Sequence, residues 1–514
     1  MPLRVGMVSL GCAKNLVDAE IMLGALAGDG LDITSDPATA DAIIVNTCSF
    51  IDAAQEESVD AILEQAALRD ASLRNQAIVV SGCLSQRYRD ELRDLLPEVD
   101  AFMGVDQVRE APAIVREAVR RRREQPDRPP PRRTRTGIRS AAGAGGPASA
   151  GPAVTVSRRP SYIPDYTTPR FRLTPPHYAY LKIAEGCNHP CSFCIIPRMR
   201  GSHRSRPEDD VVEEARRLLD EGVRELNLIS QDTTYYGLDL GVRPAGTGNP
   251  SSPARFAAAS GARPADAPNL ARLLRRLNRL PGEFWIRVLY THPAHWTDEL
   301  IGTFAACDKV VRYVDLPLQH IDEVMLQRMR RETSRAHVET LIGRLREQIP
   351  GLALRTTFIV GFPGETEGQF AGLVDFIRAA RFERLGVFPY SREVGTVAGR
   401  MQAQVSDQEK ARRLEAAMLA QREVARSITD ASVGRSVRVL VEGPATPADW
   451  LRSGLSPGGG KGAEAGSRVV ARQPADAPDI DGRVFLRGPL EAGRFVDVRL
   501  VRSADYDLEG EVVA

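Results

Sequence analysis

The chain has 514 residues, with 68 basic and 67 acidic side chains and a net charge of +1. This length predicts about three domains, and the balanced charge argues against a protein that is basic throughout and coats nucleic acid. No run of about 18 apolar residues occurs, which argues against a membrane span and predicts a cytoplasmic location. The seven cysteines are odd in number, which disfavours a disulfide framework and favours metal binding by those that cluster.

Residues 1–119 are predicted to form an N-terminal parallel α/β domain. Three apolar runs have the length of buried strands, and they alternate with helical patterns such as Asp18–Ala27 and Glu56–Ala67. Alternation of this kind is typical of a parallel sheet. The three predicted strands are Val5–Leu10, Ala42–Val45 and Ala77–Val80.

Residues 120–177 are predicted to form a linker that is largely disordered. Nine arginines lie between Arg120 and Arg139, and the next stretch, Ala141–Ala153, consists almost entirely of Ala, Gly, Pro and Ser. Such a composition cannot bury a core. The arginine run is compatible with RNA contact and with a solvated segment, and we favour the solvated segment.

Residues 178–428 are predicted to form an open (β/α)6 barrel, because six strand patterns alternate with helical patterns such as Asp209–Asp220 and Glu367–Ala380. A doubly wound sheet is the competing architecture. An insertion rich in Pro, Ala and Gly, Val242–Pro268, is predicted to be a surface loop. The six predicted strands are Tyr178–Ile183, Glu225–Ile229, Trp285–Tyr290, Val310–Leu316, Leu354–Val360 and Leu385–Pro389.

Residues 429–514 are predicted to form a small C-terminal β-barrel, because short strand patterns recur along them. A further stretch rich in Gly, Pro and Ala, residues 444–478, is predicted to be a disordered insertion in this barrel. The three predicted strands are Ser436–Val441, Arg483–Leu486 and Phe495–Val501.

A tight group of three cysteines follows the first barrel strand. Cys187, Cys191 and Cys194 have the spacing C-x3-C-x2-C and lie at the carboxyl end of the strand, where the active sites of parallel barrels gather. Three thiolates can hold three irons of a 4Fe–4S cluster and leave the fourth iron open. The amino and carboxylate groups of S-adenosylmethionine (SAM) chelate such an open iron. The alternatives are a zinc site with His189 or a distant residue as the fourth ligand, and a redox dithiol of Cys191 and Cys194.

The other clustered cysteines are far apart in the sequence but follow successive strands. Cys12, Cys48 and Cys83 each come just after one of the three predicted N-terminal strands, and the gaps of 36 and 35 residues each equal about one strand–helix unit. Loops after the strands of a parallel sheet converge at one edge. The sequence therefore predicts a second cluster with an open iron, and three unrelated buried cysteines are the alternative.

The cysteine motif after the first strand of a six-stranded α/β barrel resembles the radical SAM superfamily. Two three-cysteine sites in this order resemble, within it, the methylthiotransferase family, and the likeness covers most of the chain. The segments that carry it are Ser-Leu-Gly-Cys-Ala-Lys-Asn at 9–15, Asn-Thr-Cys-Ser-Phe-Ile at 46–51 and Thr-Phe-Ile-Val-Gly-Phe-Pro-Gly-Glu-Thr at 357–366. The tail resembles the TRAM barrel that ends these enzymes. The stretches 120–153, 242–268 and 444–478 lie outside the resemblance.

Members of this family modify tRNA adenosines or, in one branch, a ribosomal protein. Several segments of this chain resemble the protein-directed branch. They are Ile229–Thr234, Asp315–His320, Val387–Thr396, Pro478–Gly482 and Ala504–Leu508. This likeness implies methylthiolation of the β-carbon of an aspartate in protein twelve of the small ribosomal subunit. Independently, residues 430–514 hold 11 basic and 13 acidic side chains, whereas a module that grips tRNA phosphates should be basic.

A tRNA adenosine methylthiotransferase is the first alternative function, and a non-enzymatic iron–sulfur or RNA-binding protein is a remote one. An electron carrier with two clusters would need eight protein ligands, and the chain has seven cysteines. The tRNA alternative shares the chemistry and differs only in the substrate.

The resemblance implies two 4Fe–4S clusters and SAM as cofactors. It implies that the cluster on Cys187, Cys191 and Cys194 makes the radical that takes the β-hydrogen of the aspartate. The cluster on Cys12, Cys48 and Cys83 would carry sulfur, which a second SAM methylates. The implied partners are the ribosomal protein, a sulfur donor and a low-potential electron donor such as flavodoxin or ferredoxin. Nucleic acid is a secondary partner, and a membrane is not one.

Six further residues are predicted to contact the cofactor. The resemblance places Phe193 near the adenine, and Gly361 lets the backbone approach closely. Four polar groups at strand ends would bind ribose or methionine, with loop capping as the alternative; they are Gln231, Asp232, Gln319 and Glu365. Many superfamily members have Gly-Gly-Glu where this chain has Ser-Gln-Asp at 230–232, which leaves the contacts there open. Ordinary buried or loop roles are predicted for Cys307, His292 and His320.

Overall fold

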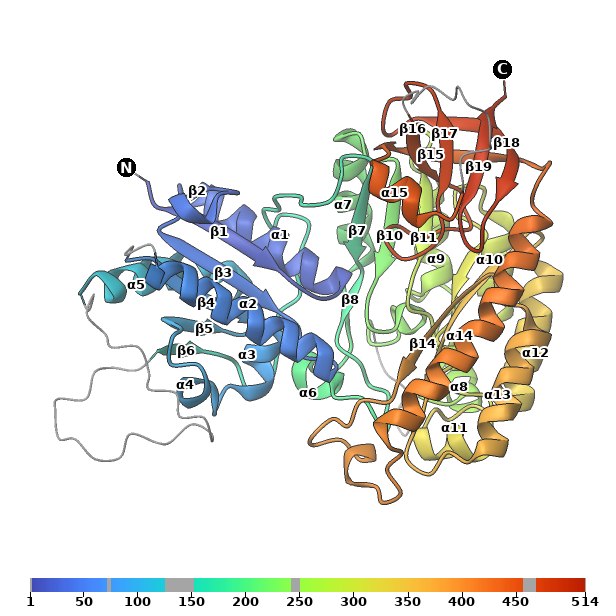
Figure 1. Cartoon of the computed structure of the whole chain (residues 1–514), viewed down its shortest axis with the longest axis horizontal. Coiled ribbons are helices and arrows are strands. Elements are labelled where there is room, and N and C mark those ends of the chain that lie inside the picture. The colour runs from blue at the N-terminus through green and yellow to red at the C-terminus, as the bar shows by residue number, and fades with distance from the viewer. Residues whose placement is uncertain (1, 72–74, 125–151, 242–249, 456–467, 514) are drawn as a thin grey trace.

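A computed structural model describes residues 2–71, 75–124, 152–241, 250–455 and 468–513. An N-terminal sheet domain, blue in Figure 1, lies beside a central barrel, and a small C-terminal barrel, red, lies against one end of the central one. Within the described residues, none of the helices is both long and apolar enough to span a bilayer.

The N-terminal domain is a six-stranded, entirely parallel sheet with the strand order β2-β1-β3-β4-β5-β6. Alternate residues of β3 face two different cores: Ile44 packs with helices α1 and α5, and Ile43 packs with α2. Burial on both faces is typical of parallel sheets and confirms the predicted α/β class. The elements are β1 Arg4–Ser9, α1 Ala13–Gly28, β2 Asp32–Ile33, β3 Ala42–Thr47, α2 Asp52–Ala71, β4 Ala77–Gly82, α3 Cys83–Tyr88, α4 Leu92–Leu95, β5 Ala101–Met103, α5 Ala111–Glu124 and β6 Ala153–Thr155.

The linker prediction is wrong at both described ends of the stretch. The first arginines of the run lie in the last turn of α5, where Arg120 pairs with Glu117 and Glu124. At the other end, β6 adds a strand to the sheet, and buried Arg170 pairs with Glu20 and Glu214. Local composition did not indicate the order of the second end, because its partners, the neighbouring strand β5 and the carboxylates of Glu20 and Glu214, come from distant parts of the chain. Residues 125–151, which hold most of the run, lie outside the described residues.

The central domain is an open barrel of six parallel strands whose neighbours follow chain order. Strands β7, β10 and β11 form one run and β12, β13 and β14 another, and a bridge from Ile286 to Val310 joins the two runs. A doubly wound sheet would reverse the order part-way, so the barrel prediction is confirmed. The strands are β7 Tyr178–Lys182, β10 Glu225–Ile229, β11 Trp285–Val288, β12 Tyr313–Asp315, β13 Ala353–Val360 and β14 Arg384–Pro389.

Helices cover the outer face of this barrel and leave a polar interior. Leu181, Leu226 and Leu354 face the helices, whereas their neighbours Lys182 and Glu225 face inward, as the two-residue period of a strand requires. The helices are α7 Glu208–Asp220, α9 Leu270–Asn278, α10 Asp298–Ala306, α11 Glu323–Met329, α12 Arg335–Gln348, α13 Glu367–Ala380 and α14 Asp407–Asp430, with α6 Ile196–Arg200 and the strand pair β8 Ala184–Glu185 and β9 Arg204–Ser205 between β7 and α7.

Part of the predicted surface loop at 242–268 is helical. Helix α8, Pro253–Gly261, packs Phe256 against Tyr235 and Leu238. Its start is set by Ser252, whose hydroxyl accepts a hydrogen bond from the Arg255 amide. Residues 242–249 lie outside the described residues.

The C-terminal domain is a closed barrel with the strand order β15-β16-β17-β19-β18, which confirms the predicted small barrel. The strands are β15 Ser436–Pro444, β16 Arg468–Arg472, β17 Val484–Arg487, β18 Phe495–Ser503 and β19 Leu508–Val512, with helix α15 Pro447–Arg452 after β15. The expectation of a disordered insertion at 444–478 is wrong for its described part, since β16 is a barrel strand and α15 an ordered helix. Residues 456–467 lie outside the described residues.

The loop after β16 seals the amino end of the central barrel. Asp476 pairs with Arg384, Asp479 accepts a hydrogen bond of 2.8 Å from Tyr178, and Asp481 accepts one of 2.6 Å from Tyr313. The three barrel residues are the first residues of β14, β7 and β12. The opposite, carboxyl end of the strands is therefore the end that faces the cysteines.

Candidate functional site

The first cysteine group lies on the loop that follows β7 and β8 at the carboxyl end of the central barrel. Backbone amides point at two of its sulfurs: His189 N lies 3.5 Å from Cys187 Sγ, and Ile196 N lies 3.4 Å from Cys194 Sγ. An arginine from the loop after α11, Arg331, lies 3.6 Å from Cys191 Sγ. Amides and a guanidinium are groups that favour sulfur in its thiolate form.

Burial raises the pKa of two thiols of this group, those of Cys187 and Cys194. Burial raises the pKa of the Cys194 thiol to about 12, with a further rise from the neighbouring Cys191 sulfur. Burial also raises the pKa of Cys187, again helped by the neighbouring sulfurs. A metal cluster needs thiolates, so its binding must release these protons.

The second cysteine group is assembled by three adjacent strands. Cys12 follows β1, Cys48 follows β3 and Cys83 follows β4, and β1-β3-β4 are neighbours in the sheet. A Cβ built on Gly11 would lie 3.1 Å from Cys48 Sγ, so the Cys12 loop touches Cys48. Burial raises the pKa of Cys48 to about 11, and Cys83 and Cys12 raise it further through their charges. The structure therefore places the three predicted cysteines at one edge of the sheet.

Side chains from the cysteine motifs hold these loops in place. Asn15 donates hydrogen bonds to the carbonyls of Leu10, at 2.6 Å, and Thr47, at 3.2 Å. Asn46 donates to the carbonyl of Asn15 at 2.8 Å. The first two sequence motifs are thus locked to each other by amide groups.

Neither cysteine group has the geometry of a single-ion site. In the described part of the chain, one group of three His, Cys, Asp or Glu residues has ligand atoms within 4.8 Å of one another, and it contains no cysteine. A zinc ion with sulfur at about 2.3 Å would bring its ligands within about 4.6 Å of each other. In each cysteine group at least two of the sulfurs lie farther apart than this, which argues against the zinc alternative.

An arginine from the first cysteine loop reaches the second cysteine group. Arg200, at the end of α6, is buried and lies 3.4 Å from Cys83 Sγ. It also pairs with Asp18 at 2.6 Å and with Glu185 at 3.4 Å, and both carboxylates bind Lys182. Because Arg200 follows Cys194 by six residues, this network ties the two cysteine sites together (α6, Figure 1).

A lysine of the N-terminal domain faces the mouth of the barrel at the same junction. The ammonium of Lys14 lies 3.0 Å from the centre of the Tyr290 ring, which follows β11. Burial lowers the pKa of Lys14 to about 8, although the charges of Cys12 and Asp315 oppose the change. The sequence analysis assigned no role to Lys14 or Arg200. Lys14 lies in the quoted motif at 9–15, two residues after Cys12, and the only signal for Arg200 was its position six residues after Cys194.

Three of the predicted cofactor residues lie on loops that meet the first cysteine loop. Phe193 packs in an apolar group that includes Phe362 and Tyr390. Glu365, on the loop of Phe362, is buried between His320, at 3.0 Å, and Arg413, at 2.7 Å. A methyl group on Gly361 would collide with Lys410 of α14. Glycine at this position therefore allows α14 to pack closely and allows the backbone to adopt a left-handed φ of +71°.

The remaining predicted residues stand at the ends of β10 and β12. Gln231 donates a 2.5 Å hydrogen bond to Glu185. The backbone of Gln319, at a φ of +73°, exchanges hydrogen bonds with Thr357 and Ile359. Their roles in binding SAM stay predictions, as do those of the other four residues.

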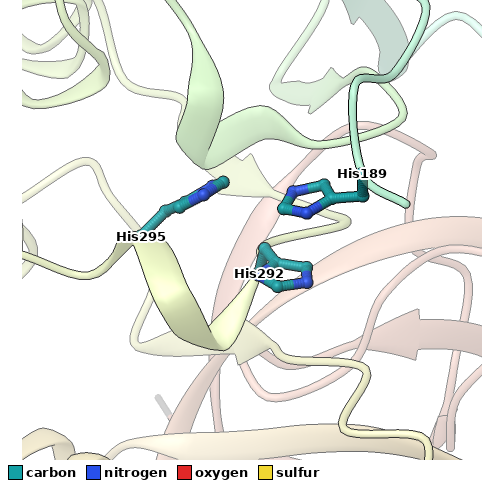
Figure 2. Close-up of side chains that lie close together, drawn as sticks. All are labelled: His189, His292 and His295. Atoms are coloured by element: carbon teal, nitrogen blue, oxygen red, sulfur yellow. The ribbon is translucent and has the colours of Figure 1, made fainter. Parts of the chain in front are cut away.

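Asp232 organises a group of histidines that the sequence did not connect. Its carboxylate lies 2.7 Å from His189 Nε2 and 2.8 Å from His295 Nδ1. The ring of His292 stacks on that of His189 with centroids 3.9 Å apart (Figure 2). The imidazole of His189 is thus bound to Asp232, and only its backbone amide points at a cysteine sulfur. The expected hydrogen-bonding roles of His292 and His320 are confirmed, since Nδ1 of each accepts a backbone amide proton two residues later.

Comparison with known proteins decides the family. Family models match at residues 4–104 (Uncharacterized protein family UPF0004), 181–377 (Radical SAM superfamily) and 460–513 (TRAM domain). The ribosomal protein uS12 methylthiotransferase RimO of Opitutus terrae is 48% identical over 98% of this chain and 96% of its own length. That of Akkermansia muciniphila is 45% identical over 99% of this chain and all of its own length. The chain belongs to the RimO methylthiotransferase family.

Membership of the RimO family makes the chain a radical SAM methylthiotransferase, as the sequence motifs indicated. The relatives do not support the tRNA-directed and non-enzymatic alternatives. Among solved structures, the radical S-adenosylmethionine methyltransferase TsrM from Kitasatospora setae matches with a TM-score of 0.48 and 16% identity, over 78% of this chain and 77% of that chain.

Proposed function

We propose that this enzyme adds a methylthio group to the β-carbon of an aspartate in ribosomal protein uS12. The substrate is supported by the name that the full-length relatives carry. The observation that carries the reaction is the meeting of two separate three-cysteine sites at one junction, bridged by Arg200. A reaction that joins a sulfur to a carbon radical needs both centres beside the same substrate atom.

In this proposal, Cys187, Cys191 and Cys194 hold one 4Fe–4S cluster. The second cluster is held by Cys12, Cys48 and Cys83. When bound, the clusters and SAM supply a 5′-deoxyadenosyl radical at the first site and a methylated sulfur at the second.

The chain itself contributes charge, order and shielding. Arg200 offers a positive charge to Cys83, and Arg331 offers one to Cys191. The burial of Cys48 and Cys83 keeps water away from these two sulfurs, which would protect a reactive intermediate from side reactions. The predicted contacts of Phe193 and Gly361 with SAM belong to the same proposal.

The partners and the division of labour are also proposed. A low-potential electron donor such as flavodoxin or ferredoxin would reduce the first site, a sulfur donor would supply the second, and the enzyme would work in the cytoplasm. Residues 1–119 would form the sulfur-carrying part, 178–428 the radical-forming part and 429–514 the substrate-docking part. Acidic residues near the chain end bind arginines of their own barrel, as Glu509 binds Arg487 and Arg502. The excess of acidic side chains is therefore weak support for docking of a basic protein.

A substrate contest tests the proposal. Protein reconstituted without oxygen receives reductant, sulfide and SAM, and is offered uS12 together with bulk tRNA. Mass spectrometry is expected to find the methylthio group on an aspartate of uS12. A methylthio group on a tRNA adenosine instead would refute the proposed substrate and keep the two-site chemistry.

A further inference from the structure

We propose that Lys14, seated on Tyr290, binds the carboxylate of the substrate aspartate and so places its β-carbon between the two cysteine sites. The inference rests on the proposed function and names a substrate-binding site within it.

Lys14 is a buried cation that forms no ion pair with a carboxylate of the described residues, although the charges of Cys12 and Asp315 lie near it. It is 7% exposed, and within the described part of the chain its ammonium makes no hydrogen bond or ion pair. Its ammonium lies over the face of the Tyr290 ring, 3.0 Å from the ring centre. A cation–π contact offsets only part of the cost of burying a charge, so the site is incomplete until an anion enters it.

The neighbouring cations are already neutralised. Arg200 binds Asp18 and Glu185, Lys182 binds the same two carboxylates, and Arg355 binds Asp315 at 2.9 Å. Lys14 alone in this set has no carboxylate. An incoming negative group at the junction therefore meets its counter-charge at Lys14.

The position of Lys14 matches the geometry that the reaction needs. Lys14 lies in the first turn of α1, two residues after Cys12, and touches a residue at the carboxyl end of β11. Its ammonium thus lies where the sulfur-carrying site meets the barrel mouth. In an aspartate the β-carbon is bonded directly to the carboxylate carbon, so a cation that holds the carboxylate also fixes the carbon to be modified. A neutral adenine base offers no such group.

The backbone of Tyr290, which carries the ring beneath Lys14, is fixed by the barrel. Tyr290 has a left-handed φ of +62°, which is uncommon for a bulky residue, and its amide donates a 2.8 Å hydrogen bond to Asp315. Asp315 is fixed in turn by Arg355. The ammonium therefore rests on a platform that the barrel positions, even though Lys14 belongs to the other domain.

A double-mutant cycle tests this assignment by binding and not by turnover. The probe is a fluorescent uS12 peptide that contains the aspartate modified in the substrate contest, beside the same peptide with Asn at that position. Wild-type and Lys14→Met proteins, both reconstituted, are titrated without SAM and followed by anisotropy. Wild type is expected to bind the Asp peptide about 10- to 100-fold more tightly than the Asn peptide, and Lys14→Met to bind both about equally.

Two controls separate this role from a structural one. Lys309 also places its ammonium over an aromatic ring, 4.5 Å from Phe284, but lies next to the amino end of the barrel strands. Lys309→Met should keep the full preference for Asp. The iron content of Lys14→Met should equal that of wild type, and Lys14→Gln provides a second neutral variant if the Met variant folds poorly.

The possible outcomes are distinct. An Asp preference that survives in Lys14→Met overturns the proposal, and so does an equal loss of affinity for both peptides. Weaker tRNA binding in Lys14→Met with unchanged peptide binding would assign the cation to a phosphate and also overturn it. If wild type binds neither peptide, the proposed function fails and the Lys14 assignment fails with it.

Discussion

The two cysteine sites each consist of three cysteines, but the chain brings those cysteines near one another in different ways. Cys187, Cys191 and Cys194 lie within eight residues on one loop, so their spacing alone predicts that they bind a common ligand. Cys12, Cys48 and Cys83 are spread over 72 residues and meet only because β1, β3 and β4 are neighbours in a parallel sheet. The first site is therefore formed by one short segment, whereas the second requires the folded N-terminal sheet.

This difference predicts different sensitivities. A local loop needs only its own backbone and a few amides, such as those of His189 and Ile196, to present its sulfurs. The second site needs a correct sheet register, the asparagine bonds between loops and an arginine from the other domain. Damage far from the sulfurs should therefore affect the second site more than the first.

The largest effect is expected from Cys191→Ala. Loss of one of three ligands should lower reductive cleavage of SAM at least about 1,000-fold, because the removed thiolate has no substitute on that loop. Production of 5′-deoxyadenosine, measured by chromatography, is the readout. Cleavage at the wild-type rate would show that this loop is not the radical-forming site.

Cys48→Ala tests the N-terminal cysteine site in the same way. Sulfur transfer to uS12 should fall at least about 100-fold, while cleavage of SAM continues, because Cys48 belongs to the other site. Iron content should drop by about half. Loss of SAM cleavage as well would mean that the two sites are not separable, and loss of neither activity would refute the second site.

Arg200→Met tests whether the second site depends on the barrel. Removal of this buried guanidinium leaves Asp18 and Glu185 with less counter-charge and should cost about 3 kcal/mol of stability. It should also lower iron in the N-terminal site first. The control is Arg344→Met, whose partner Asp298 is exposed, and which should cost less than about 1 kcal/mol. Equal shifts in the urea midpoint would contradict the proposed bridge.

Gly82→Ala tests the backbone beneath Cys83. Gly82 has a φ of +95°, and a Cβ there would lie 2.5 Å from the Thr47 carbonyl. The change should cost about 1–3 kcal/mol, visible as a lower melting temperature and weaker iron binding. Gly28→Ala, at the end of α1 where nothing lies within 4 Å, should be neutral or slightly stabilising.

The smallest effect is a difference in thiol reactivity. In the iron-free protein, Cys48 should react with iodoacetamide more slowly than the exposed Cys12 at pH 8. The thiolate fraction of Cys48 is small below its pKa of about 11, so its rate should rise about tenfold per pH unit up to that point. Cluster loading should protect both residues and leave the buried Cys307 unchanged, as peptide mass spectrometry would show. Equal rates for Cys12 and Cys48 across this range would contradict the environment described for Cys48.

Much of the fold could be predicted because strand periodicity is local. The apolar runs after residues 4, 41 and 76 and the six barrel patterns became strands in the expected places. The stretch 444–478 was misjudged because its order comes from outside itself. Asp476 and Asp479 are fixed by Arg384 and Tyr178 of the central barrel, and no local pattern shows such partners.

The amino-acid sequence alone predicted the chemistry, because the cysteine spacing, the placement of cysteines at strand ends and the motifs that resemble the family can all be found in residue order. It also determined the three-part organisation, which follows from periodicity. Only the tertiary structure decided which charges meet at the junction: Arg200 reaches Cys83, and Lys14 rests on Tyr290 without a carboxylate. The physical reason is that a hydrogen bond or ion pair depends on a distance of a few ångströms in space and not on separation in the sequence. Cys83 and Arg200 are 117 positions apart in the chain and still in contact.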